Sequence, residues 1–104
     1  MITANWENLA LSVKDGETEV AGGLLEIKDG EYYISFEEYE TGQGFGDFAA
    51  RVLLRRAFDM GAGTQYALTK KDDTALFKKL GFSEISREGD LVKLRRVGDI
   101  LGDC

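Results

Sequence analysis

A glycine-rich turn followed by a long apolar helix is the part of this sequence best suited to chemistry. Three glycines alternate in the turn, namely Gly42, Gly44 and Gly46. Glycine has no Cβ, so its backbone adopts positive φ angles and approaches a ligand closely. The first N–H groups of the following helix lack helical partners, and its dipole is positive at that end. The pattern therefore predicts an anion site suited to a phosphate or pyrophosphate.

The glycines alone do not fix the ligand of this turn. A Walker phosphate loop needs Gly-Lys-Ser/Thr, and a dinucleotide-binding fingerprint needs a further glycine; neither is present here. A tight connection between a strand and a helix would use glycines in the same way, for geometry only. An anion site and a tight connection are both open interpretations of the turn by itself.

Length and composition indicate one folded, acidic domain. The chain has 104 residues, of which 43% are hydrophobic, enough for a single core. The formal charge of −6 argues against nucleic-acid binding, which depends on cationic contacts to phosphates. An acidic surface also suits a cationic partner, although solubility is the commoner reason for it. No apolar run is long enough to cross a bilayer and no signal peptide follows Met1, so we expect a cytoplasmic protein.

Several kinds of catalytic centre are excluded by composition. Histidine is absent, which removes the commonest general base and the commonest metal ligand, so no metal site is predicted. Cys104 is the only cysteine and the last residue, a poor place for a catalytic thiol. In the same C-terminal tail, Ile100 and Leu101 are expected to pack on the domain or on a partner.

Alternating apolar residues predict three strands in the first part of the chain. They run over approximately residues 9–13, 19–27 and 32–36. Turn signals at Asp15-Gly16 and Asp29-Gly30 connect them as an antiparallel meander. Gly22-Gly23, inside the second of these strands, predicts a bulge or a close approach of another group. Trp6 is expected to anchor the weakly patterned N-terminus.

A helix, a strand, a short helix and two strands are predicted to follow the glycine turn. Their approximate ranges are 47–60, 64–69, 74–80, 83–87 and 91–96. Gly61 is expected to end the first helix, and Asp72 or Asp73 to cap the second. A right-handed crossover would make the strands on either side of the first helix parallel. The fold class is thus α/β (α+β), with a mixed sheet of about six strands.

Charged residues on the first helix follow a four-residue spacing. Asp47 and Arg51, and then Arg55 and Asp59, are placed to form ion pairs along one face. A solvated helix face is the simplest interpretation of these arginines and of Arg56.

These motifs resemble those of the GNAT N-acetyltransferases. Thr41-Gly42-Gln43-Gly44-Phe45-Gly46, with the helix behind it, is similar to motif A of that family. Ala75 to Phe82, which reads ALFKKLGF, is similar to motif B. The two motifs occur in the family's order, with a strand between them and a meander in front. The resemblance covers roughly Leu9 to Arg96 and identifies residues 1–104 as a single, short GNAT-like domain.

The resemblance implies that the ligand is acetyl-CoA or CoA and that the reaction is acyl transfer to an amine. In the family, pyrophosphate lies on main-chain N–H groups of the glycine turn, and the thioester lies where two central parallel strands part. The acceptor would be a small-molecule or a protein amine. The residues implied in CoA binding are Phe36, Thr41, Gly42, Gln43, Gly44, Phe45, Gly46 and Asp47.

Candidate catalytic groups lie at the end of the strand before the turn. Glu37 and Glu38 would stand beside the thioester, where a carboxylate can accept a proton from an ammonium substrate. Acidic residues that are merely exposed at a strand end are the alternative. Tyr33, Tyr39 and Tyr66 are candidates for the general acid, although tyrosines in strands usually serve packing.

The sequence departs from the family's pattern at several positions. Thr41 stands where the family has Arg or Gln, Lys70 where it often has Asn, and Phe77 where many members have the tyrosine that protonates the thiolate. The chain also begins about where the family's second strand begins, so we expect its first strand and two acceptor-side helices to be absent. The alternative function is therefore a non-catalytic GNAT-fold module that binds CoA or a protein. An exposed front edge of the sheet would favour a homodimer.

Overall fold

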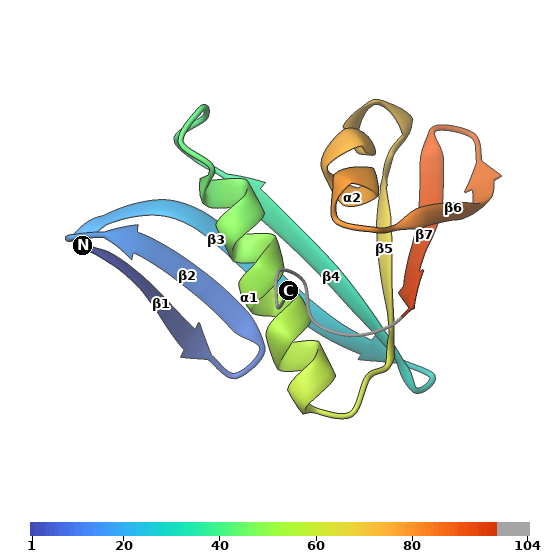
Figure 1. Cartoon of the computed structure of the whole chain (residues 1–104), viewed down its shortest axis with the longest axis horizontal. Coiled ribbons are helices and arrows are strands. Elements are labelled where there is room, and N and C mark those ends of the chain that lie inside the picture. The colour runs from blue at the N-terminus through green and yellow to red at the C-terminus, as the bar shows by residue number, and fades with distance from the viewer. Residues whose placement is uncertain (98–104) are drawn as a thin grey trace.

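A single mixed sheet of seven strands forms the framework of the molecule (Figure 1). The computed structural model describes residues 1–97, so Ile100, Leu101 and Cys104 lie outside the described residues. The strand order is β1-β2-β3-β4-β5-β7-β6. The strands are β1 (Ile2–Glu7), β2 (Ala10–Asp15), β3 (Thr18–Lys28), β4 (Glu31–Glu38), β5 (Thr64–Lys70), β6 (Ser83–Glu88) and β7 (Leu91–Val97). Two α-helices, α1 (Phe45–Asp59) and α2 (Ala75–Lys79), and a short 3-10 turn, η1 (Lys71–Asp73), complete the predicted mixed α/β fold.

The first four strands form an antiparallel meander, and the turn signals predict its last three strands, β2 to β4. Asp29 and Gly30 both have positive φ, of 51° and 80°, as a tight hairpin turn requires. β1 is the strand that the sequence analysis did not assign, because its residues are exposed on both faces apart from the half-buried Trp6. Asn8 and Leu9 alone connect β1 to β2, so no helix lies between these strands.

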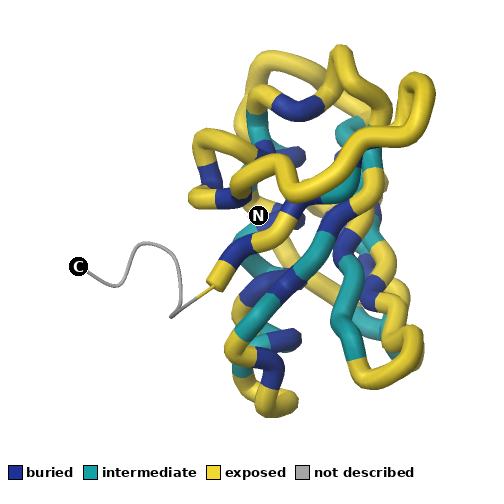
Figure 2. The backbone as a smooth tube through the Cα atoms, turned by 90° about the vertical axis from the view of Figure 1, so that its right-hand side faces the viewer, coloured by how far each residue is buried: buried dark blue, intermediate teal, exposed yellow. Residues whose placement is uncertain are grey.

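Both helices cover the same face of the sheet, and the core lies between them and the strands. On β3, a Cβ at Gly23 would lie 2.7 Å from Cδ1 of Leu53, so α1 approaches the backbone there. This confirms the close approach predicted for the paired glycines. Phe36 stands opposite Gly23 on the neighbouring strand and contacts Phe77 of α2, which places α2 on that face too. Figure 2 shows the resulting alternation of buried and exposed residues.

The structure confirms the predicted C-terminal ends of both helices, but not the predicted N-terminal cap of α2. Gly61 has φ of 100°, and the N–H of Ala62 bonds the carbonyl of Ala57 at 3.0 Å, a Schellman motif. α2 ends in the same way, with φ of 96° at Gly81 and the N–H of Phe82 on the carbonyl of Phe77. The capping prediction for α2 was wrong. Asp72 and Asp73 belong to η1, and Thr74 precedes α2 without a side-chain cap.

The ion pairs predicted along α1 are confirmed. Arg51 Nε lies 2.9 Å from Asp47 Oδ2, and Arg55 Nε lies 3.1 Å from Asp59 Oδ2. Neither helix in the described part of the chain is long and apolar enough to cross a membrane.

Candidate functional site

β4 and β5 run parallel but pair over a very short stretch. Their only partners are Tyr32 with Gln65 and Tyr33 with Tyr66. Both strands continue beyond these pairs, β4 to Glu38 and β5 to Lys70. The strands therefore part toward their carboxyl ends, as Figure 1 shows. Carboxyl ends of parallel strands are a common place for ligands in α/β folds.

A cleft of about 390 Å³ lies where these strands part. It is lined by Phe36, Thr69, Asp72, Asp73, Ala75, Leu76 and Phe77. The floor is aromatic, because the ring of Phe36 lies 5.1 Å from that of Phe77, which in turn lies 5.4 Å from Phe82. Thr69 and the two aspartates add polar groups. An apolar cleft of this size with a few polar groups is typical of small-molecule sites.

The glycine turn that follows β4 has the geometry predicted from the sequence. Gly42 and Gly44 have φ of 83° and 80°, which L side chains rarely adopt. A Cβ at either position would meet nothing within 4 Å, so the space beside the turn is open. Thr41 and Gln43 are exposed in the same turn, and α1 begins at Phe45. Main-chain N–H groups at the start of α1 thus border open space, which fits an anion.

Glu38 accepts a hydrogen bond from one of these N–H groups. Its Oε2 accepts the N–H of Gly46 at 3.1 Å in a partly buried position. A Cβ on Gly46 would lie 3.4 Å from Cβ of Glu38, so the two residues are in close contact. A carboxylate at a helix N-terminus stabilises the helix. It also competes with any external anion for the same donor.

The charge around the turn is negative. Glu37, Glu40 and Asp47 stand near Glu38 in the sequence, and the turn contains no Lys or Arg. Asp47 Oδ2 pairs with Arg51, whereas its buried Oδ1 has no hydrogen-bond partner among the described residues. A bound pyrophosphate would therefore depend on main-chain donors rather than on basic side chains.

Glu37 lies on the opposite face of the sheet from Glu38, because successive strand residues point to opposite sides. It is exposed and lines a depression of about 350 Å³ with Ser35 and Tyr39, above the backbone of Gly22. Desolvation raises the pKa of Tyr39 above its ordinary value of 10.0, and the charges of Glu19 and Glu37 act in the same direction. The structure thus separates the two predicted carboxylates and places Glu37 with Tyr39.

A stacked pair of tyrosines marks the last paired position of β4 and β5. The rings of Tyr33 and Tyr66 lie 5.4 Å apart, and Lys93 Nζ lies 4.8 Å from the Tyr66 ring centroid. The hydroxyl of Tyr33 donates to Glu31 Oε1 at 2.9 Å, and this bond is the main cause that lowers the pKa of Glu31. Both tyrosines face away from α1, so their hydroxyls are remote from the aromatic floor of the cleft. This cluster is not predictable from the sequence, because its members meet only through the pairing of β4, β5 and β7.

A buried polar cluster joins α2 to the sheet behind the cleft. Arg96 donates to the carbonyl of Leu80 at 3.0 Å and to Gln65 Oε1 at 3.2 Å. Gln65 in turn donates to the carbonyl of Ala62. This cluster is not predictable from the sequence, since Gln65 and Arg96 have the pattern of ordinary polar strand residues.

Comparison with solved structures supports the fold. The ribosomal-protein-S18-alanine N-acetyltransferase from Escherichia coli superposes with a TM-score of 0.75 at 14% identity, covering 91% of this chain and 72% of that one. The PaiA N-acetyltransferase from Thermoplasma acidophilum, solved in complex with coenzyme A, gives 0.77 at 13% identity, with 86% and 60% covered. YncA from Salmonella typhimurium, a putative acetyltransferase with its cofactor acetyl-CoA, gives 0.73 at 17%, with 86% and 64% covered. No protein-family model and no curated protein sequence matches the chain.

The chain therefore shares its fold with these N-acetyltransferase structures, which confirms the GNAT-like fold that its two motifs predicted. It spans between 60% and 72% of the three N-acetyltransferase-like chains named above.

Proposed function

We propose that the cleft between β4 and β5 binds an acyl-CoA and that the domain transfers the acyl group to an amine. The observation that carries this proposal is the early end of the β4–β5 pairing, at Tyr33 and Tyr66. It leaves a cleft beside a glycine turn with open space in front of it. Two of the similar structures hold CoA or acetyl-CoA, which supports the same ligand class here.

The residues of the cleft and of the glycine turn fit two parts of such a ligand, the pantetheine arm and the pyrophosphate. The pantetheine arm would lie on Phe36 and Phe77, and its amides would meet the backbone of β4 beyond Tyr33, which β5 leaves unpaired. The pyrophosphate would lie on the amides of the Gly42 to Asp47 segment, where Thr41 and Gln43 are exposed. The Gly46 amide is the exception, because Glu38 must release it first.

The CoA thioester supplies the acyl group, and the protein supplies positioning and proton transfer. Transfer forms a C–N bond to the amine, breaks the C–S bond, and moves one proton from the nitrogen to the departing sulfur. Glu37 is the predicted carboxylate that is exposed and unattached to the helix. It faces the side of the sheet opposite Phe36 and Phe77, so it would accept that proton through a water molecule at the end of β4. Phe77 cannot donate a proton to the departing sulfur, since its ring carries no proton donor. Ser35 and Tyr39 are the hydroxyl-bearing residues that line the depression with Glu37.

A second candidate function is a CoA-binding module without catalysis. It is favoured by Phe77 in the floor of the cleft and by the carboxylates around the turn. Binding and turnover therefore have to be measured separately.

Calorimetric titration with acetyl-CoA and with CoA tests the binding proposal. Gly44→Glu adds bulk and charge at the open side of the turn, and Gly30→Glu is its matched control. Both glycines have φ of 80° and nothing within 4 Å of a Cβ, but Gly30 lies in the hairpin between β3 and β4. We expect binding by the wild type and the control, and an affinity about tenfold weaker or worse for Gly44→Glu. No heat from the wild type at millimolar ligand overturns the proposal.

Turnover distinguishes the two candidate functions. Release of free thiol from acetyl-CoA is followed with a panel of mono- and polyamines and amine-bearing peptides. Glu37→Gln is expected to lower kcat by about 10²-fold or more if Glu37 is the general base. Tight binding of acetyl-CoA without thiol release across the panel would favour the non-catalytic module.

A further inference from the structure

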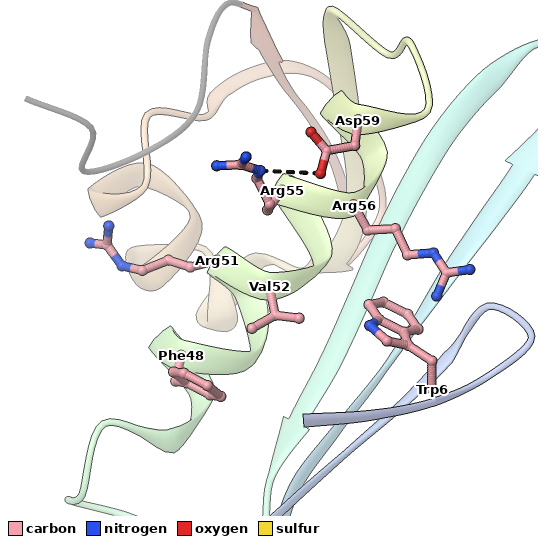
Figure 3. A pocket seen from close by; sticks show the side chains of 7 residues that line it. All are labelled: Trp6, Phe48, Arg51, Val52, Arg55, Arg56 and Asp59. Atoms are coloured by element: carbon pink, nitrogen blue, oxygen red, sulfur yellow. Dashed lines mark hydrogen bonds and ion pairs between the residues drawn. The ribbon is translucent and has the colours of Figure 1, made fainter. Parts of the chain in front are cut away.

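A second groove runs along the outer side of α1, next to β1 (Figure 3). Its volume is about 520 Å³, and it is lined by Trp6, Phe48, Arg51, Val52, Arg55, Arg56 and Asp59. It shares no lining residue with the cleft between β4 and β5. From Phe48 to Asp59 it follows α1 for about 16 Å, at 1.5 Å per residue. The groove is therefore a separate, elongated feature that the proposed acyl transfer does not use.

The groove combines an apolar floor with arginines at its rim. Trp6 comes from β1, and Phe48 and Val52 lie one turn apart on α1. The chain has six arginines, and three of them line this groove although the net charge is −6. They are Arg51, Arg55 and Arg56. Such a surface attracts a carboxylate-bearing partner with some apolar character.

The arginine side chains retain donors for a partner. Arg51 and Arg55 bond their helix neighbours through Nε, and their side chains are 41% and 60% exposed. Figure 3 shows the Arg56 guanidinium next to the Trp6 ring, and its distance from the ring centroid is 4.2 Å. Stacking engages the face of a guanidinium and leaves its in-plane N–H groups directed outward. Arginine forks of this kind match the geometry of carboxylates.

β1 offers a main-chain edge beside the same groove. It is the first strand in the sheet order, so its outer edge pairs with no strand of the described chain. Its sequence, ITANWE, contains no Pro or Lys, the residues that usually block pairing at an edge. A peptide that pairs with such an edge adds a strand through main-chain hydrogen bonds. Every second side chain of that strand would face the same side as Trp6, toward α1.

We infer that the β1 edge and the α1 groove together dock an extended acidic peptide of a partner protein. Apolar side chains at the centre of the peptide contact Trp6, Phe48 and Val52, and carboxylates on either side pair with the arginines. A second copy of this chain fits less well. The strand that it would present, β1, carries only one carboxylate, Glu7, for the three arginines.

The only tryptophan of the chain, Trp6, lies in the groove and reports binding directly. The probe is the peptide acetyl-DEFELEDE-amide, whose alternate residues D, F, L and D share one face of a strand. The peptide acetyl-KKFKLKKK-amide keeps the apolar positions and reverses the charge. We expect a saturable change of Trp6 fluorescence with the acidic peptide and none with the basic one.

Two double variants with the same charge change separate docking from general attraction. Arg55→Glu with Arg56→Glu is expected to weaken binding by about tenfold or more, because carboxylates then face carboxylates. Arg87→Glu with Arg95→Glu, on β6 and β7, is the control and should stay close to wild type. Circular dichroism verifies that both variants are folded. Equal losses in the two variants, or no response at millimolar acidic peptide, overturns the proposal. A dimer in sedimentation, together with a change of Trp6 fluorescence as the dimer forms, would also overturn the proposal, in favour of a second copy.

Discussion

Replacing Glu38 by Gln perturbs the hydrogen bond through which Glu38 competes with an external anion for the N–H of Gly46. Glu38 Oε2 lies 3.1 Å from the Gly46 nitrogen, which is where an oxygen of a bound pyrophosphate would have to lie. The carboxylate and the phosphate cannot use this donor together. Glutamine keeps the size of the side chain and an oxygen acceptor but removes the charge.

The expected gain in affinity follows from the charge that is removed. Two unit charges about 4 Å apart repel by roughly 1 kcal/mol in water and by about 4 kcal/mol at an effective dielectric constant of 20. Because Glu38 is half-exposed, the lower figure applies, which corresponds to roughly a fivefold rise in affinity for CoA. Stability changes in the opposite direction. Loss of a negative charge at the α1 N-terminus should lower the free energy of unfolding by about 0.3–1 kcal/mol.

Calorimetric titration with CoA, together with urea unfolding, checks both halves of this prediction. Glu40→Gln is the control, because Glu40 is exposed in the same turn and its replacement removes the same charge. Equal affinities for the two variants would refute the reasoning, since the effect would then be long-range charge and not competition for the Gly46 amide. A complete lack of CoA binding by the wild type and both variants would instead reject the proposed function.

Two further predictions concern the framework of the site. Gly23→Ala should lower the free energy of unfolding by about 1–3 kcal/mol, because its Cβ would lie 2.7 Å from Leu53 Cδ1 and 3.0 Å from the Ser35 carbonyl oxygen. Gly63→Ala, whose Cβ would meet nothing within 4 Å, is the control for the urea midpoint. The hydrogen bond from Tyr33 lowers the pKa of Glu31 below its ordinary 4.5, so this contribution to stability is present above that pH and is lost as the pH falls below it. Glu31→Gln should flatten the acid side of a stability profile between pH 2 and pH 6, a range chosen to span that pKa; an unchanged profile contradicts this assignment.

Features that depend on local chemistry could be predicted from the sequence. Asp29-Gly30 specified a tight hairpin, and Gly61 and Gly81 specified two helix ends, because positive φ is needed there and few residues tolerate it. β1 could not be found in this way. Its side chains are exposed on both faces, so they carry no period, and the strand exists through its pairing with β2.

The site was predictable in its backbone and less so in its side chains. The glycine turn lies at the start of α1 as expected, but Glu37 and Glu38 do not share the single position predicted for them. Alternation along β4 sends them to opposite faces, and this could have been deduced from the strand itself. The bond from Gly46 to Glu38 was not deducible, because it needs the position of the helix start relative to the strand end.

The cleft is built from contacts that need no ligand. Tyr33 and Tyr66 stack at the last paired position, and beyond it Phe36 and Phe77 line the cleft where the strands diverge. Phe77 is held from behind by Phe82, which also closes the Schellman motif of α2. A phenylalanine at this position therefore lines the floor of the cleft as the ring of a tyrosine would, without a hydroxyl. The shape required for an acyl-CoA and the group required to protonate its sulfur thus depend on different atoms, so binding can persist in this fold where catalysis does not.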